Sequence, residues 1–166
     1  MSLIKPQKKD WRLMLVSIFV IALLGFVIAS VLFSYFYVNK FKSFAAEIEK
    51  RVDIQKPQTK PDVTLDGTPM EMKENGWDKF KYYIREMKPG KTRKDFPGDE
   101  QGSVLEFRFH NNDVLEICEA PIKENQRRRD EGICMRYTKT DGTVYLFDTD
   151  QFGFNDFKLL FVEQKA

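Results

Sequence analysis

The chain has 166 residues, which is room for one domain of ordinary size and a short anchor. Its 27 basic and 25 acidic residues nearly cancel and are interspersed over most of the sequence. This distribution lacks the basic face that nucleic-acid binding requires, so no nucleic-acid partner is expected. The 15 phenylalanines and 6 tyrosines indicate a chain that folds around a core, because disordered segments are poor in aromatic residues.

A long apolar stretch near the N-terminus predicts one transmembrane helix. Residues 13–38 contain no charged side chain. At about 1.5 Å per residue, this stretch is longer than the roughly 30 Å hydrocarbon core of a bilayer. Trp11 on one side and Tyr35 and Tyr37 on the other suit the aromatic belts at the two membrane interfaces.

The basic tail of residues 1–12 predicts the orientation of this helix. Because basic residues are retained on the cytoplasmic side, we expect a cytoplasmic N-terminus. The C-terminal domain is then periplasmic or extracellular, and the protein is an integral, single-pass protein of the plasma (inner) membrane.

A cleaved signal peptide is the alternative to a retained anchor. Ser43-Phe44-Ala45 before Ala46 loosely fits the small-x-small cleavage pattern. However, the apolar stretch is far longer than the roughly 7–15 residues of a signal peptide. Lys40 and Lys42 also interrupt it before the cleavage pattern. We therefore expect the helix to be retained.

Two patterns along this helix predict contacts with other membrane subunits or with a second copy of the chain. Small residues at a spacing that permits close approach of another helix lie at Gly25, Ala29, Ser30 and Ser34. An apolar stripe at spacings of three and four follows the span and comprises Phe41, Phe44, Ile48 and Val52. A stripe of this kind needs a partner, which we expect outside the chain. Residues 39–63 are thus predicted as a juxtamembrane helix that ends in a proline-containing linker, residues 55–61.

Residues 64–166 are predicted to form an α+β domain of one helix packed on an antiparallel meander of four to five strands. The helix begins near Gly76, with Asn75 as a candidate cap, and Pro89-Gly90 ends it. Alternating apolar residues predict four strands, at residues 103–109, 114–119, 133–138 and 143–147. Residues 157–162 predict a fifth strand, with a terminal helix as the alternative.

The only two cysteines, Cys118 and Cys134, lie in two of the predicted strands. If these strands are neighbours, a disulfide would close a loop of about 16 residues and stabilise the domain by roughly 3 kcal/mol. Such a bond would fit an oxidising compartment. Two buried free thiols are the alternative.

Candidate catalytic and metal-binding residues lack the context that their chemistry needs. His110 lies in a predicted turn, Ser103 has no nucleophile elbow, and Cys118 has no neighbouring cation. Residues 148–159 begin like a calcium loop, but Leu159 occupies the position of the bidentate carboxylate. We expect no catalytic residue, no cofactor and no bound metal.

Two groups of residues are candidates for contact with a protein partner. An arginine run, Arg127, Arg128 and Arg129, would bind an acidic surface or a phosphate, or would form a solvated loop because acidic residues flank it. The aromatic residues Phe152 and Phe154 would form an exposed docking patch or pack in the core.

These features lead to an expectation about function. We expect a non-catalytic structural or assembly subunit of a cell-envelope complex, such as a secretion, pilus or transport machine. Its domain outside the cytoplasm would dock a protein partner. The alternatives are a domain that binds or senses a small ligand and, less favoured, a membrane-anchored hydrolase.

Overall fold

A computed structural model describes residues 11–52, 60–90, 93–100, 102–120, 132–149 and 151–164. The chain divides into two compact units, Met1–Asn39 and Lys40–Ala166. The long helix α1 (Trp11–Arg51) contributes its N-terminal part to the first unit and its last turns to the second.

The first unit is apolar over the whole circumference of its helix. Its most apolar window of 18 residues has a mean hydropathy of 2.9, and none of that window is buried inside the chain. Large side chains such as Phe26 remain exposed. By length and composition α1 is able to cross a membrane, which is compatible with a single-pass membrane protein.

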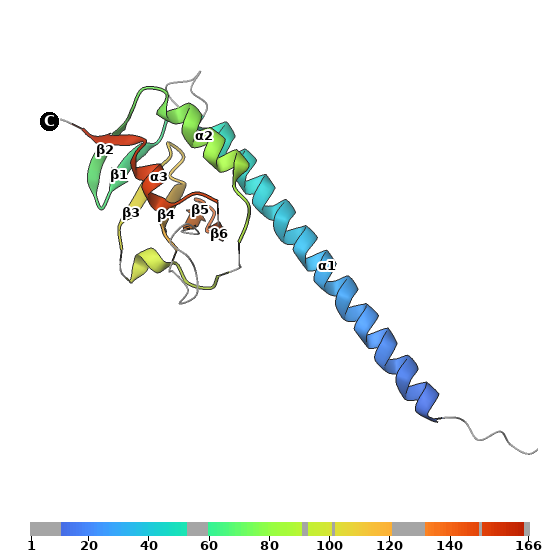
Figure 1. The fold of residues 1–166 in the computed structure, drawn as a ribbon. Helices are drawn as coiled ribbons and strands as arrows, with labels where there is room; N and C mark the ends of the chain where they lie inside the picture. The colour runs from blue at the N-terminus through green and yellow to red at the C-terminus, as the bar shows by residue number, and fades with distance from the viewer. Residues whose placement is uncertain are drawn as a thin grey trace, which may run out of the picture. The chain divides into compact units, whose positions relative to one another are not determined.

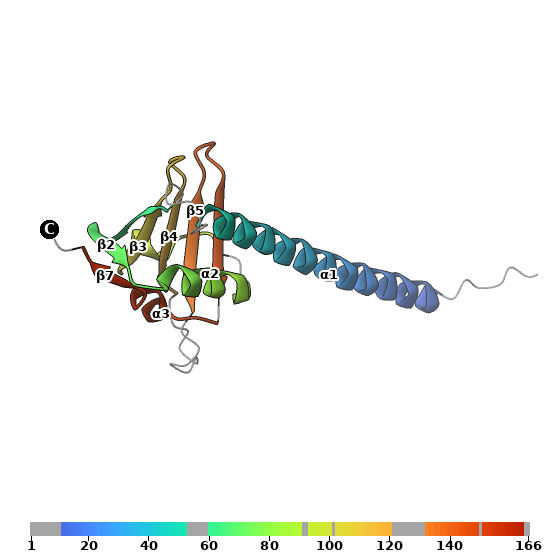
Figure 2. The ribbon, with the colours of Figure 1, turned by 90° about the horizontal axis from the view of Figure 1, so that it is seen from above.

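The second unit is built on one antiparallel sheet of seven strands in the order β6-β5-β4-β3-β1-β2-β7. Figure 2 shows the central strands of this sheet side by side. In chain order the strands are β1 (Asp62–Leu65), β2 (Thr68–Met72), β3 (Val104–Arg108), β4 (Val114–Glu119), β5 (Ile133–Thr138), β6 (Val144–Thr149) and β7 (Phe161–Glu163). The α+β class is confirmed. The expected count of four to five strands is wrong.

The two missing strands, β1 and β2, form a short hairpin. Their turn is Asp66-Gly67, and both residues have positive φ angles, 51° and 79°. An Asp-Gly pair is a strong hairpin signal, because both central residues of this turn type must adopt positive φ. The signal was therefore present in the sequence, but each strand is too short to show a clear alternation.

The C-terminal segment contains both a helix and a strand, the two alternatives for residues 157–162. It forms a short helix, α3 (Phe154–Lys158), and then strand β7, which pairs with β2. The predicted helix after Asn75 is α2 (Gly76–Glu86). Asn75 stands at the cap position with a positive φ of 58°, but its side chain makes no capping hydrogen bond.

One face of the sheet carries the core, and helices cover it. Phe80 of α2 packs on Phe107 of β3 with ring centroids 4.9 Å apart, and on Phe157 of α3 at 5.8 Å. Figure 1 shows α2 and α3 on this face of the sheet. We call it the core face.

The apolar stripe at the end of α1 is part of this core. Its four members, Phe41, Phe44, Ile48 and Val52, are at most 2% exposed. The rings of Phe41 and Phe44 each lie 5.1 Å from the ring of Phe147 on β6. The expected partner outside the chain is therefore wrong, because the stripe packs on the sheet of its own chain. The domain is larger than residues 64–166, and residues 55–59 of the expected linker lie outside the described residues.

A buried carboxylate ties the end of α1 to the tips of two hairpins. Asp113 is 2% exposed. It accepts hydrogen bonds from the Tyr137 hydroxyl at 2.6 Å and the Thr140 backbone N–H at 2.8 Å, and it pairs with Arg51 of α1 at 3.0 Å. Burial opposes its ionisation, but these hydrogen bonds outweigh burial and hold the pKa of Asp113 well below its usual range.

We expect a fragment that begins at Lys40 to fold and a fragment that begins at Lys60 to remain unfolded. Each of the four buried stripe residues contributes roughly 1.5–3 kcal/mol by burial, so their loss removes an amount comparable to the stability of a whole domain. Circular dichroism and amide proton dispersion in NMR spectra would distinguish the two fragments. A cooperatively folded 60–166 fragment would show that the stripe is dispensable.

We also expect Asp113→Asn to destabilise the domain by about 2–3 kcal/mol at pH 7, because the carboxylate accepts several hydrogen bonds and pairs with Arg51. The pKa of Asp113 is lowered in the folded state, so its contribution is present above about pH 4 and is lost as the pH falls below that value. Urea unfolding of the wild type and the variant at pH 7 and pH 3 would measure both effects. An equal loss of stability on acidification in both proteins would contradict this assignment.

Candidate functional site

The face of the sheet opposite the core, which we call the open face, is partly covered by residues 93–100. This segment follows α2 and includes a 3-10 turn, η2 (Pro97–Asp99). Arg93 fixes its start, because its Nε donates to both carboxylate oxygens of Asp148 on β6, at 2.6 and 2.7 Å. Phe96 then lies buried against the sheet.

Arg136 on β5 holds the other end of this segment. Its guanidinium donates to both carboxylate oxygens of Glu116, at 2.5 and 2.7 Å, and to Asp99 at 2.6 Å. It also stacks over the ring of Phe96, with its Cζ 4.3 Å from the ring centroid. Glu116 lies directly opposite Arg136 on β4, so the strand register supplies this bidentate pair. Hydrogen bonding to Glu116 raises the pKa of Arg136, which keeps the guanidinium charged.

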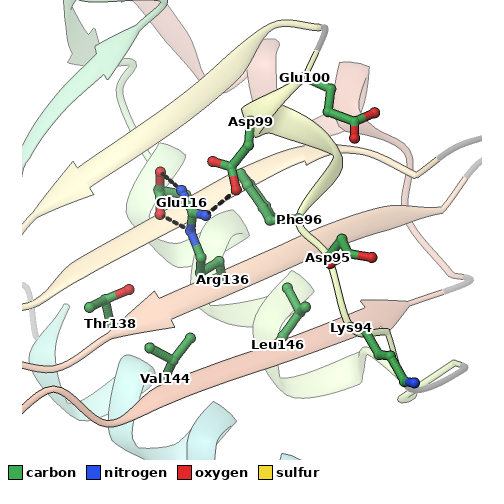
Figure 3. A pocket seen from close by; sticks show the side chains of 10 residues that line it. All are labelled: Lys94, Asp95, Phe96, Asp99, Glu100, Glu116, Arg136, Thr138, Val144 and Leu146. Atoms are coloured by element: carbon green, nitrogen blue, oxygen red, sulfur yellow. Dashed lines mark hydrogen bonds and ion pairs between the residues drawn. The ribbon is translucent and has the colours of Figure 1, made fainter.

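A hollow of about 510 Å³ lies beside this arginine on the open face, between residues 94–100 and strands β4, β5 and β6. Figure 3 shows Arg136 at its centre, joined to Glu116 and Asp99. Its lining comprises Lys94, Asp95, Phe96, Asp99, Glu100, Glu116, Arg136, Thr138, Val144 and Leu146. Four carboxylates therefore stand against two cations, and the hollow is acidic. Its floor near β6 is apolar.

The two cysteines lie under this cover, directly opposite each other on β4 and β5. Both are buried free thiols packed against Phe96, so the expected disulfide is absent. The Ala120 N–H donates to the Gly132 carbonyl, which makes Cys118 and Cys134 a hydrogen-bonded pair. In such pairs the Cα atoms are about 5.5 Å apart, and the side chains are farther apart than at the alternate positions.

The thiols interact without a covalent bond. The hydrogen bond between the two sulfurs raises the pKa of Cys134, and burial and the nearby Asp148 carboxylate raise it further. A thiol that stays protonated is a weak nucleophile. Cys134 is therefore suited to packing.

The structure separates the candidate catalytic residues. Ser103 precedes β3 and His110 follows it, so they lie at opposite ends of that strand, about 20 Å apart. Cys118 lies opposite Val104, the neighbour of Ser103. Cys118 is therefore also far from His110. Asp148 of the incomplete calcium loop is bound by Arg93. Within the described residues, no group of acidic, histidine or cysteine side chains is arranged to hold a metal ion.

The candidate partner contacts have different outcomes. Arg127, Arg128 and Arg129 lie outside the described residues. Phe154 is buried, which confirms the core-packing alternative and shows that its assignment to an exposed docking patch is wrong. Phe152 is half-buried, with its ring centroid 4.5 Å from that of Tyr83, and its role as a contact remains a prediction.

The small residues of α1 remain a prediction for helix pairing. The Ser30 hydroxyl donates to the Phe26 carbonyl of the same helix at 2.8 Å, so its hydrogen-bonding capacity is met within the helix. Gly25 has open space where a Cβ would lie. The hollow has no local signal in the sequence, because its residues come from segments that are far apart in the chain.

We expect both thiols to resist an aromatic disulfide reagent in the folded full-length chain and to react after unfolding, because Cys118 and Cys134 are 2% and 0% exposed. A variant with an added cysteine at the exposed position Val144 is the control that should react at once. Fewer than two reactive thiols after unfolding without reductant would reveal an oxidised pair.

Comparison with known proteins gives no relative. No protein-family model, no curated protein and no solved structure matches the chain.

Proposed function

We propose that the protein is a membrane-anchored, non-catalytic subunit of a cell-envelope complex, and that its domain outside the cytoplasm docks a protein partner. The observation that carries this proposal is the double use of α1. One part of this helix is apolar on all sides and exposed, and its last turns supply the core of the folded domain.

The participation of α1 in the core supports retention of the helix. Cleavage before Ala46, where the small-x-small pattern lies, would remove Phe41 and Phe44 from the core. Each of these buried side chains contributes roughly 1.5–3 kcal/mol. A domain with a stability of about 5–15 kcal/mol would lose much of it. An uncleaved helix is therefore a better fit than a signal peptide, and the basic tail favours a cytoplasmic N-terminus.

The open face of the sheet supports the docking role. Its hollow is wide, its polar rim is acidic, and the central guanidinium is already neutralised by Glu116 and Asp99. A small anion would have to compete with these carboxylates for Arg136. This arrangement suits a broad contact with a protein more than a small ligand, which is usually enclosed by its pocket.

A tagged full-length chain, extracted from membranes in mild detergent, would test this proposal. We expect it to resist extraction at alkaline pH, to start before residue 13, and to elute with another protein in a fixed ratio. The control is the fragment from Lys40 exported by a cleavable leader. It should bind the same protein more weakly, because it loses the effective concentration that a shared membrane provides.

Three results would overturn the proposal. They are a soluble full-length chain, a mature N-terminus at Ala46, and a partner-free monomer under every extraction condition. Ligand-dependent thermal stabilisation of a monomer would favour the small-ligand alternative.

A further inference from the structure

Strand β6 lies at an edge of the sheet, and no strand among the described residues pairs with its outer side along its first half. Its sequence there, Val144-Tyr145-Leu146-Phe147, has none of the lysines or prolines that protect edges from pairing. The Lys139 N–H donates to the Thr143 carbonyl, so these two residues form a hydrogen-bonded pair. Along β5 and β6, hydrogen-bonded pairs therefore alternate with non-hydrogen-bonded pairs from this point. Tyr145 and Phe147 bond to β5, so the backbone groups of Val144 and Leu146 point outward. The described residues form no backbone hydrogen bond to these outward groups.

The second half of β6 already accepts a strand-like segment of the chain. Pro89 forms an antiparallel bridge with Thr149, and the Gly90 N–H donates to the Asp148 carbonyl at 2.6 Å. Arg93 binds the Asp148 side chain, where the cover of the open face begins. The outer edge of β6 can therefore pair with an antiparallel strand. Among the described residues, no segment pairs with its first half.

The acidic hollow lies beside that available half, since Val144 and Leu146 both line it. Its carboxylates are not all engaged. Glu116 and Asp99 bind Arg136, whereas Asp95 and Glu100 form no ion pair among the described residues. Figure 3 shows these last two side chains directed away from Arg136. Within the described residues, the hollow beside the edge strand thus includes two carboxylates that no ion pair neutralises.

We propose that β6 takes up an extended segment of a partner protein as an added antiparallel strand, with basic side chains at alternate positions over the hollow. Partner residues opposite Val144 and Leu146 would point to the open face, as those two residues do. Backbone hydrogen bonds would provide affinity, and the acidic rim would select for lysine or arginine. This inference rests on the proposed docking function and names the partner chemistry.

The other face restricts the intervening partner residue. It would lie beside Tyr145, where the Lys40 ammonium is 5.2 Å from the ring centroid. A small or polar residue fits this position better than a second cation. The expected segment therefore alternates basic and small residues.

Synthetic peptides and the full-length chain in detergent micelles would test this proposal by fluorescence anisotropy. The probe is an acetylated nonapeptide of alternating lysine and threonine. One control peptide has glutamate in place of lysine. A second carries N-methyl groups on alternate residues, which keeps its charge and removes its capacity to pair. We expect the lysine peptide to bind at least tenfold more tightly than either control.

Variants of the chain separate strand addition from simple charge attraction. Leu146→Pro removes an outward N–H and leaves the ladder to β5 intact, whereas Leu146→Ala is its matched control. We expect the proline variant to bind the lysine peptide at least tenfold more weakly than the alanine variant. Val144→Pro, at the first residue of the strand, repeats the test if Leu146→Pro does not fold. The double variant Asp95→Lys, Glu100→Lys should bind the lysine peptide more weakly and the glutamate peptide more tightly than the wild type does.

Several results would overturn this inference. Equal binding to the proline and alanine variants, or to the N-methylated peptide, would show that no strand is added. A dimer of the wild type that the proline variant disrupts would assign the edge to a second copy of the chain. If the chain co-extracts with a partner but does not bind the peptide, strand addition is wrong and the proposed complex still stands. If the chain binds the peptide but is always extracted as a partner-free monomer, the proposal that it is a subunit of a complex is wrong.

Discussion

The packing of Phe41 and Phe44 on strands β5 and β6 is the interaction on which the folded unit depends. The sheet has a row of large apolar side chains on one face, and α2 and α3 lie over only part of it. The end of α1 supplies further cover. Arg51 also forms an ion pair with Asp113 at the hairpin tips. This ion pair and the aromatic contacts hold the end of α1 in the same position on the sheet.

The open face owes its features to the same strand alternation that builds the core. Residues next to core positions along β4 and β5 point the other way, which places Cys118, Glu116 and Arg136 on the open face. The register then sets the cysteines opposite each other and the arginine opposite its carboxylate. A shift of one residue would exchange the two faces and remove both arrangements. The hollow is therefore a direct consequence of the pairing of these strands.

Sequence patterns predicted the elements whose signals are local. Strands β3 to β6 alternate clearly, and α2 has an apolar face that ends before Pro89. The hairpin of β1 and β2 was missed because its strands are short and Pro69 interrupts one of them. The stripe on α1 was recognised, but its partner was not, since periodicity identifies an apolar face without revealing what covers it. The segment of residues 93–100 has no periodicity, so its place over the cysteines depends on the distant residues Asp148 and Arg136.

The participation of α1 in the core also affects how the domain is made. Phe41 emerges from the ribosome roughly a hundred residues before Phe147, the residue on which it packs. Strand β7, which completes the sheet beside β2, comes last of all. Until then the aromatic stripe and several strand edges have no partners, and a chain in this state is prone to aggregation. The fold therefore requires each chain to close its sheet on its own stripe before that stripe meets the strands of a neighbouring chain.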